Sequence, residues 1–166
     1  SGMYALRSRL NIPVLGPGQA AFHVACMLGH KFSVITMWDE WFHLYRKVLT
    51  EYKLESRCAS LRSINTRPDL EELLAGKEEV IFEKLEKESL KAIQEDGADV
   101  IVLGSTTMHQ SHGFLQQALP VPVINPGLMS YKLCEMFLET GLTHSKTAFP
   151  APQQPNDQFI LSRVPD

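Results

Sequence analysis

The sequence lacks the features that mark membrane-spanning, secreted and nucleic-acid-binding proteins. No apolar run approaches the ~20 residues that a membrane-spanning helix needs. The first residues do not have the layout of a signal peptide. Lysine and arginine form no cluster, and the formal net charge is −3, which argues against nucleic acids and anionic membranes as partners. We therefore expect a cytoplasmic protein whose partners are small molecules.

Cysteine is scarce, and its spacing fits no metal site. The chain has three cysteines, an odd number without the paired spacing of zinc ligands. Cys26 and Cys134 fall in helical patterns, and Cys58 falls in a strand-like one. Because free cysteine is among the most buried residue types, we expect all three to be buried packing residues. The sequence thus predicts no metal site.

The most informative segment is residues 99–127, which read DVIVLGSTTMHQSHGFLQQALPVPVINPG. Residues 99–104 form an apolar, β-branched run that stops at glycine and a hydroxyl cluster, which is typical of a buried parallel strand. A helix-like segment, 108–119, and a second short strand, 120–125, follow. This pattern predicts a βαβ unit, and ligands of open α/β sheets collect where such a first strand ends.

Strands and helices alternate along the chain, which predicts an α/β fold with a parallel sheet flanked by helices. The expected strands are residues 13–15, 32–36, 59–64, 100–103 and 120–125, and the expected helices are residues 19–28, 39–53, 71–95, 108–119 and 128–140. The charged residues of the helix at 71–95 are expected to form a solvated face.

The length of the chain suits a single hydrophobic core. We expect one α/β domain over residues 1–149 and a proline-rich tail over residues 150–166. The tail is open to three interpretations: a linker, an edge strand at residues 159–161, or an arm that reaches a partner subunit.

Residues 104–108 read Gly-Ser-Thr-Thr-Met. They resemble the Gly-Cys-Thr-Thr-Met type of motif that ends the second active-site strand in the aspartate/glutamate/hydantoin racemase superfamily. The similarity extends through residues 12–16, 19–23, 29–36 and 141–146, and it is nearest to the hydantoin and allantoin racemases. The resemblance implies a flavodoxin-like fold and a cofactor-independent racemase or isomerase of amino-acid derivatives. Its ligand would be a small carboxylate or a hydantoin-like ring.

The resemblance also implies a catalytic position, which Ser105 occupies in this chain. Racemases of this family use two cysteines, one at each of two related strand ends: one thiolate removes a proton and the other thiol returns one to the opposite face. Cysteine suits both roles because its pKa of about 8.5 allows both protonation states near neutrality. A serine hydroxyl does not do this unaided, so we expect racemisation to be impaired.

An internal repeat concerns the other cysteine position. Residues 12–18 match residues 121–127, in agreement with the two pseudosymmetric halves of the family. The repeat places the counterpart of Ser105 ahead of residue 1, and we expect this chain to lack that N-terminal part. We therefore expect one complete racemase-type half plus the trailing strand and helix of the other. We also expect a homo-oligomer that covers the exposed strand edges.

The hydroxyl cluster at residues 105–107 suggests how a ligand is held. A strand end before a helix presents hydroxyls and backbone N–H groups that can bind a carboxylate or imide oxygen. Capping of the next helix is the alternative use of these residues. The candidates for substrate binding are Thr106 and Thr107 in the cluster, Thr36 and Met37 at the end of the neighbouring strand, Gly16 at a helix start, and His109 after the motif.

His109 and His112 are close enough in sequence to act as a base for Ser105 or as a pair of metal ligands. The pattern of a serine hydrolase is missing, and two histidines alone make an incomplete metal shell. Polar surface or helix-start contacts are the simpler interpretation of both residues. Three functions remain open: a racemase, a non-catalytic protein that binds small carboxylates or supports assembly, and a serine-dependent lyase or decarboxylase.

Overall fold

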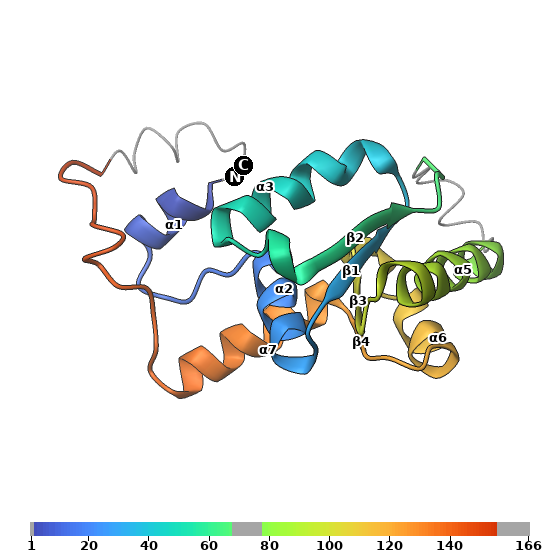
Figure 1. Cartoon of the computed structure of the whole chain (residues 1–166). Helices are drawn as coiled ribbons and strands as arrows, with labels where there is room; N and C mark the ends of the chain where they lie inside the picture. Colours follow the sequence, from blue (N-terminus) through green and yellow to red (C-terminus); the bar gives the residue numbers. More distant parts are fainter. Residues whose placement is uncertain (1, 68–77, 156–166) are drawn as a thin grey trace, which may run out of the picture. The chain divides into compact units, whose positions relative to one another are not determined.

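The computed structural model describes residues 2–67 and 78–155, and the chain divides into two compact units. The first unit joins the two ends of the chain, residues 1–14 and 134–166, and the second comprises residues 15–133. The second unit holds the four-stranded sheet (Figure 1). The predicted domain boundary at residue 149 stays a prediction, and the edge strand predicted at residues 159–161 lies outside the described residues.

Four parallel strands form the sheet: β1 (Phe32–Thr36), β2 (Cys58–Ser63), β3 (Val100–Leu103) and β4 (Val123–Ile124). Their order is β2-β1-β3-β4, which is the flavodoxin-like order and has its topological switch point between β1 and β3. In the register, Val34 of β1 lies opposite Leu61 of β2 and Val102 of β3. The predicted α/β fold with a parallel sheet is confirmed.

Helices cover both faces of this sheet. The helices are α1 (Met3–Arg9), α2 (Pro17–Leu28), α3 (Phe42–Tyr52), α5 (Glu78–Asp96), α6 (Ser111–Ala118) and α7 (Pro126–Glu139), with short 3₁₀ turns η1 (Asp39–Trp41), η2 (Glu55–Arg57) and η3 (Thr106–Met108). Helices α2 and α3 pack on one face of the sheet, and α5 and α6 pack on the other. The helix predicted at 71–95 is described from residue 78, and the helix predicted at 108–119 is split into η3 and α6.

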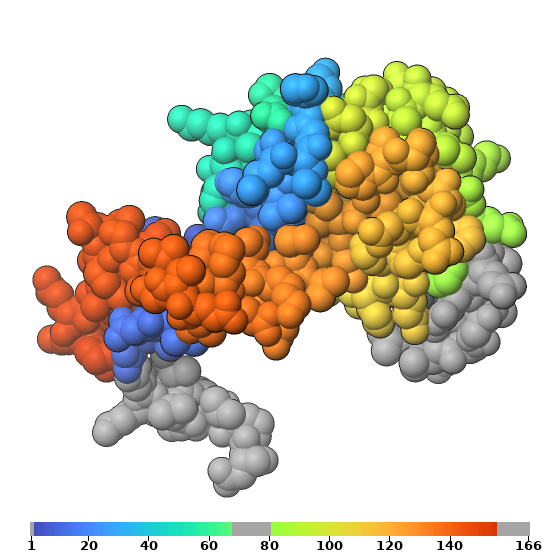
Figure 2. Space-filling view, turned by 90° about the horizontal axis from the view of Figure 1, so that it is seen from below, coloured from blue at the N-terminus to red at the C-terminus, as the bar shows by residue number. Residues whose placement is uncertain are grey.

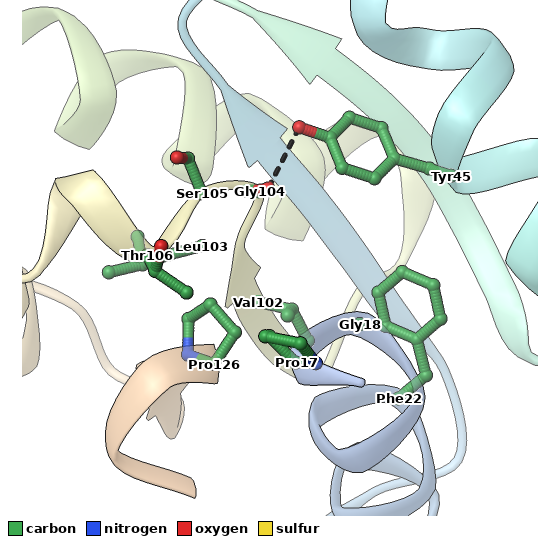
Figure 3. Close-up of a pocket in the computed structure, with 10 residues that line it drawn as sticks. All are labelled: Pro17, Gly18, Phe22, Tyr45, Val102, Leu103, Gly104, Ser105, Thr106 and Pro126. Atoms are coloured by element: carbon green, nitrogen blue, oxygen red, sulfur yellow. Dashed lines mark hydrogen bonds between the residues drawn. The ribbon is translucent and has the colours of Figure 1, made fainter. Parts of the chain in front are cut away.

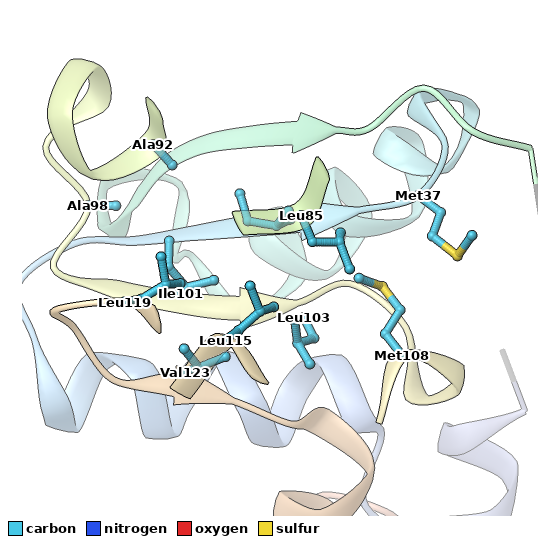
Figure 4. Packing of buried hydrophobic residues seen from close by; sticks show 11 residues of the cluster. Met37, Leu85, Ala92, Ala98, Ile101, Leu103, Met108, Leu115, Leu119 and Val123 are labelled. Carbon is cyan, nitrogen blue, oxygen red and sulfur yellow. The ribbon is translucent and has the colours of Figure 1, made fainter. Parts of the chain in front are cut away.

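The core has two layers because side chains alternate across the two central strands. Leu103 of β3 points toward α5 and α6, where it meets Leu85 and Leu115 (Figure 4), and Ile35 of β1 belongs to the same cluster. The intervening residues pack on the opposite face against α2 and α3. Each of these fully buried aliphatic side chains contributes about 1.5–3 kcal/mol through removal of apolar surface from water. The central strands are therefore apolar on both sides, as their sequence predicts.

An ion-pair cluster fastens edge strand β2 to α5. The Arg62 guanidinium lies 2.6 Å from a carboxylate oxygen of Asp96 and 2.7 Å from one of Glu95. Glu88 lies 3.5 Å from the same guanidinium. The hydrogen bond from Arg62 holds the pKa of Asp96 below its usual value. Part of the charged face that was expected to be solvated is thus paired with the edge strand.

The prediction of a strand at residues 13–15 is wrong. Both backbone groups of Val14 bond to side chains instead of to a neighbouring strand. Its N–H donates to His144 Nε2 at 2.7 Å, and its carbonyl accepts from Arg7 Nε at 3.0 Å.

The strand predicted at residues 120–125 is reduced to two residues. Pro120 and Pro122 have no N–H to offer a neighbouring strand, although the Pro122 carbonyl accepts from Ile101.

The first unit is built around the end of α1. Lys146 Nζ donates to the carbonyls of Arg7, Ser8 and Leu10, at 2.9, 3.1 and 2.6 Å. A cation is favourable at this position because the last carbonyls of a helix carry partial negative charge. The buried Arg7 also places its guanidinium 5.4 Å from the ring centre of Phe149. Long-range polar contacts thus order a unit that has little apolar core.

We predict that acidification weakens the contact between His144 and Val14. Burial, and then the positive charge of Arg7, lower the pKa of His144 below its ordinary value. Nε2 accepts the Val14 N–H only when the imidazole is neutral, so the contact is intact above the unfolded-state pKa of about 6.5. It is lost as the pH falls through the lower folded-state pKa.

NMR titration of the His144 ring should therefore give a midpoint below that of free histidine. The Val14 amide should shift and exchange faster with the same midpoint. In His144→Gln, which keeps an acceptor but does not titrate, the Val14 amide should respond less between pH 7 and 5. A His144 midpoint at or above the ordinary value would contradict this account.

Candidate functional site

The end of β3 is held closely against the end of β1. The Gly104 N–H donates to the carbonyl of Ile35 at 2.8 Å, which extends the strand pairing by one step. A β-carbon on Gly104 would lie 2.6 Å from the Tyr45 hydroxyl oxygen and 2.7 Å from Thr36 Cβ. Because neither contact is sterically possible, glycine is required here. The chain then leaves the sheet at Ser105.

A cavity of about 240 Å³ lies at this carboxyl end of β3. Its lining comes from the starts of α2 and α7, from α3, and from the end of β3: Pro17, Gly18, Phe22, Tyr45, Val102, Leu103, Gly104, Ser105, Thr106 and Pro126. In Figure 3 the rings of Phe22 and Tyr45 approach the space from the side opposite Thr106 and Pro126. No charged side chain is among these described lining residues. The predicted position for a ligand, the end of the first βαβ strand, is thus where a cavity occurs.

The predicted catalytic position, Ser105, borders this cavity and is bonded to a neighbouring hydroxyl. Ser105 Oγ lies 2.8 Å from Thr107 Oγ1 and accepts the Thr107 N–H at 3.3 Å. Thr106 is exposed and also lines the cavity. Ser105 therefore caps the turn that follows it, so the capping role considered from the sequence is present alongside the exposure to the cavity.

The structure does not pair Ser105 with a histidine. His112 Nε2 lies 3.1 Å from the carbonyl of Val123, a contact that fixes α6 to β4. His109 is exposed at the end of η3. Among the described residues, no group of three or more His, Cys, Asp or Glu side chains is placed to hold a metal ion. Within the described part of the chain, the arrangement thus offers hydroxyls but no histidine as a general base next to Ser105.

Two helices begin beside the cavity, and they differ in how their first N–H groups are used. At α7, the Asn125 side-chain oxygen accepts from the N–H groups of Gly127 and Leu128 at 3.0 and 3.2 Å. At α2, the N-cap residue is Gly16, and no side chain caps the helix. Gly18, in the first turn of α2, lines the cavity, whereas the predicted binding residue Gly16 is not among its lining residues. Because Pro17 has no N–H, the backbone of Gly18 is what the start of α2 presents to the cavity.

Thr36 and Met37 were expected to face the same crevice, but the structure places them elsewhere. Thr36 is fully buried, and its hydroxyl lies 2.8 Å from that of Tyr45. Met37 is buried in the core and lines a separate cavity of about 20 Å³ together with Thr107 and Met108. Of the predicted residues, the structure therefore brings Ser105 and Thr106 together at the cavity of about 240 Å³.

Sequence reasoning missed the aromatic side chains of the site. Tyr45 belongs to the buried face of α3 and Phe22 to that of α2. Their helical spacing predicts burial but not that they border a cavity. The phenol hydroxyl on an otherwise apolar helix face was the one available signal, because a buried hydroxyl needs a hydrogen-bond partner.

The three cysteines lie away from the cavity lining. All are partly exposed, which corrects the prediction that they are buried. Burial nevertheless raises the pKa of Cys58 to about 11 and raises that of Cys26 in the same direction. Both thiols are therefore protonated at neutral pH, and neither has the activated character of a catalytic cysteine.

Comparison with known proteins gives the relatives of this chain. A hydantoin racemase from Rhizobium meliloti is 34% identical over 149 residues, which are 87% of this chain and 59% of the relative. An allantoin racemase from Klebsiella pneumoniae superposes with a TM-score of 0.84 at 30% identity, covering 93% of this chain and 62% of the other. The allantoin racemase from Pseudomonas fluorescens gives a TM-score of 0.82 at 30% identity, covering 94% and 66%.

The chain thus spans about three fifths of the length of the curated relative. The family model described as Asp/Glu/Hydantoin racemase matches residues 1–134. This match includes the whole sheet, the hydroxyl cluster and the cavity at the end of β3. The chain belongs to the Asp/Glu/hydantoin racemase family.

Proposed function

We propose that this chain binds a small carboxylate or a hydantoin-like ring at the end of β3. We also propose that it is, by descent, a cofactor-independent cytoplasmic racemase or isomerase whose proton transfer is impaired. The single observation that carries the proposal is that Ser105, at the position of the family cysteine, borders a cavity of about 240 Å³. The relatives that support it are hydantoin and allantoin racemases.

Impairment follows from the chemistry available at position 105. A racemase of this kind needs one group that removes a proton and a second that returns one to the opposite face, and a serine hydroxyl needs an adjacent base to take either role. The near neighbour of Ser105 Oγ is the hydroxyl of Thr107 at 2.8 Å. A hydroxyl of similar acidity does not activate it. Binding should therefore persist where turnover does not.

The lining of the cavity favours a ligand with little charge. Its polar side chains are those of Ser105, Thr106 and Tyr45, of which the Tyr45 hydroxyl is already hydrogen-bonded to Gly104 and Thr36, and Gly18 adds its backbone. The start of α2 can stabilise one carboxylate or imide oxygen through the Gly18 N–H and the helix dipole. A second carboxylate would meet no cationic side chain among the described lining residues. A hydantoin-like ring or a monocarboxylate fits this site better than aspartate or glutamate.

A non-catalytic binding protein is the second candidate. The hydrogen bonds of Ser105 to Thr107 favour it, since they are those of a capping residue. The two candidates share the ligand and differ in whether position 105 exchanges protons.

We predict that the chain does not racemise hydantoins, allantoin, aspartate or glutamate above the rate in buffer. Exchange of the α-proton in deuterium oxide, followed by NMR, detects even slow turnover. Ser105→Cys would supply a thiol at the family position, and Ser105→Ala is the matched control. Measurable exchange by the unmodified chain that disappears in Ser105→Ala would overturn the inactive interpretation.

We predict that a hydantoin or a small carboxylate stabilises the chain and that Thr106→Val reduces this effect. A ligand at ten times its Kd adds about 1.4 kcal/mol, or roughly 3–6 °C of melting temperature for a chain of this size. Thr147→Val, which changes an exposed threonine of the other unit, is the control. If neither ligand class at millimolar concentration raises the melting temperature, capping is sufficient to explain the hydroxyl cluster.

We further propose that the chain forms a homo-oligomer, and we predict a dimer at micromolar concentration. Residues 13–15 are not a strand, so they provide no exposed strand edge. The proposal is supported by edge strand β4 and by the start of α7, visible in Figure 2, where Leu128 and Tyr131 are 50% and 60% exposed. Sedimentation equilibrium tests this directly. A mass near 18.7 kDa with a cooperative melt would refute it.

A further inference from the structure

The hydroxyl of Tyr45, a residue of α3, contacts both central strands at the site. Its hydroxyl donates to the carbonyl of Gly104 at 2.9 Å and lies 2.8 Å from Thr36 Oγ1. The residue is only 8% exposed. A phenol has one proton, and the carbonyl can only accept, so the Thr36 hydroxyl must be the donor toward Tyr45. The result is a directed chain of hydrogen bonds from Thr36 through Tyr45 to Gly104.

This chain sets the orientation of the peptide between Gly104 and Ser105. The peptide is trans, so the carbonyl of Gly104 and the N–H of Ser105 point in opposite directions. Once the carbonyl is held by Tyr45, the direction of the Ser105 N–H and the position of its Cβ are restricted. The N–H of Gly104 is held as well, by the carbonyl of Ile35. Both backbone groups of Gly104 are therefore anchored immediately before position 105.

We propose that Tyr45 is a positioning residue for position 105, acting through the Gly104 carbonyl. The inference rests on the proposed function, since it takes position 105 as the working position of the site. Tyr45 does not act on a substrate with its hydroxyl, because that group is already committed to Gly104 and Thr36. Its ring forms part of the cavity lining.

Two observations support this assignment. There is no room for a side chain between Tyr45 and the strand end, because a β-carbon on Gly104 would lie 2.6 Å from the Tyr45 hydroxyl oxygen. Burial also raises the pKa of Tyr45, so the phenol keeps its proton and its role as donor throughout the neutral pH range.

The test uses a thiol at position 105 as a reporter that needs no turnover. In Ser105→Cys, the thiolate can accept the Thr107 N–H that Ser105 Oγ accepts now, at 3.3 Å, and this contact should lower its pKa. The rate of alkylation by iodoacetamide is measured against pH, and mass spectrometry assigns each modified cysteine. The native thiols, Cys26, Cys58 and Cys134, serve as internal controls.

Adding Tyr45→Phe removes the hydroxyl and keeps the ring. We expect the titration midpoint of the reporter thiol to rise and its alkylation rate at pH 7 to fall about fivefold, the equivalent of one hydrogen bond. Tyr52→Phe makes the same chemical change on the same helix, away from the site, and should leave both values unchanged. If Tyr45→Phe does not fold, Thr36→Val, which removes the donor to Tyr45, should give a smaller change in the same direction.

An unchanged rate and midpoint in the folded Tyr45→Phe protein, or in Thr36→Val where it replaces that variant, would overturn the proposal. A change of similar size in the alkylation rate of every cysteine would also overturn it, because it would show a general change in the structure rather than positioning. Ligand binding and racemisation do not enter this measurement. Failure of the proposed function therefore appears in the ligand experiments, and failure of the positioning role appears here.

Discussion

The pairing of β1 with β3 is the contact on which the rest of the second unit depends. Both strands are buried on both faces, so each supplies side chains to two core layers at once. The pairing also brings the ends of the two strands together, with the Gly104 N–H bonded to the Ile35 carbonyl. The cavity exists because the chain turns away from the sheet at this point while the starts of α2 and α7 stand beside it.

The chain belongs to the racemase family, but we propose that Ser105 does not carry out the family's proton transfer. The chain matches the family model over residues 1–134 and superposes on an allantoin racemase with a TM-score of 0.84. In our proposal Ser105 stands at the position of the family's catalytic cysteine, and its hydroxyl is hydrogen-bonded to that of Thr107. A scaffold of this kind keeps what the backbone provides, namely N–H groups and a shaped cavity. We expect it to lose the proton transfer that depends on one side chain with a suitable pKa.

The polar contacts of the chain show how much of its order comes from long-range hydrogen bonds. Arg62 joins an edge strand to the end of α5, and Lys146 binds three carbonyls at the end of α1. Tyr45 joins α3 to the end of β3. In each case one side chain with a fixed hydrogen-bonding geometry restrains backbone or charge at an element's end, where regular secondary structure leaves groups unpaired.

The sequence by itself determined the α/β class, the two central strands and the buried helix faces, because apolar periodicity reports which surfaces avoid water. It also determined the family, through the motif at residues 104–108. Only the tertiary structure decided that Val14 bonds to His144 instead of a strand, that Thr36 is sealed beneath Tyr45, and that Tyr45 holds Gly104. The partners in the first and last of these contacts are 130 and 59 residues apart in the chain. Local patterns encode burial, whereas the partner of a buried polar atom is set by which distant segment packs against it.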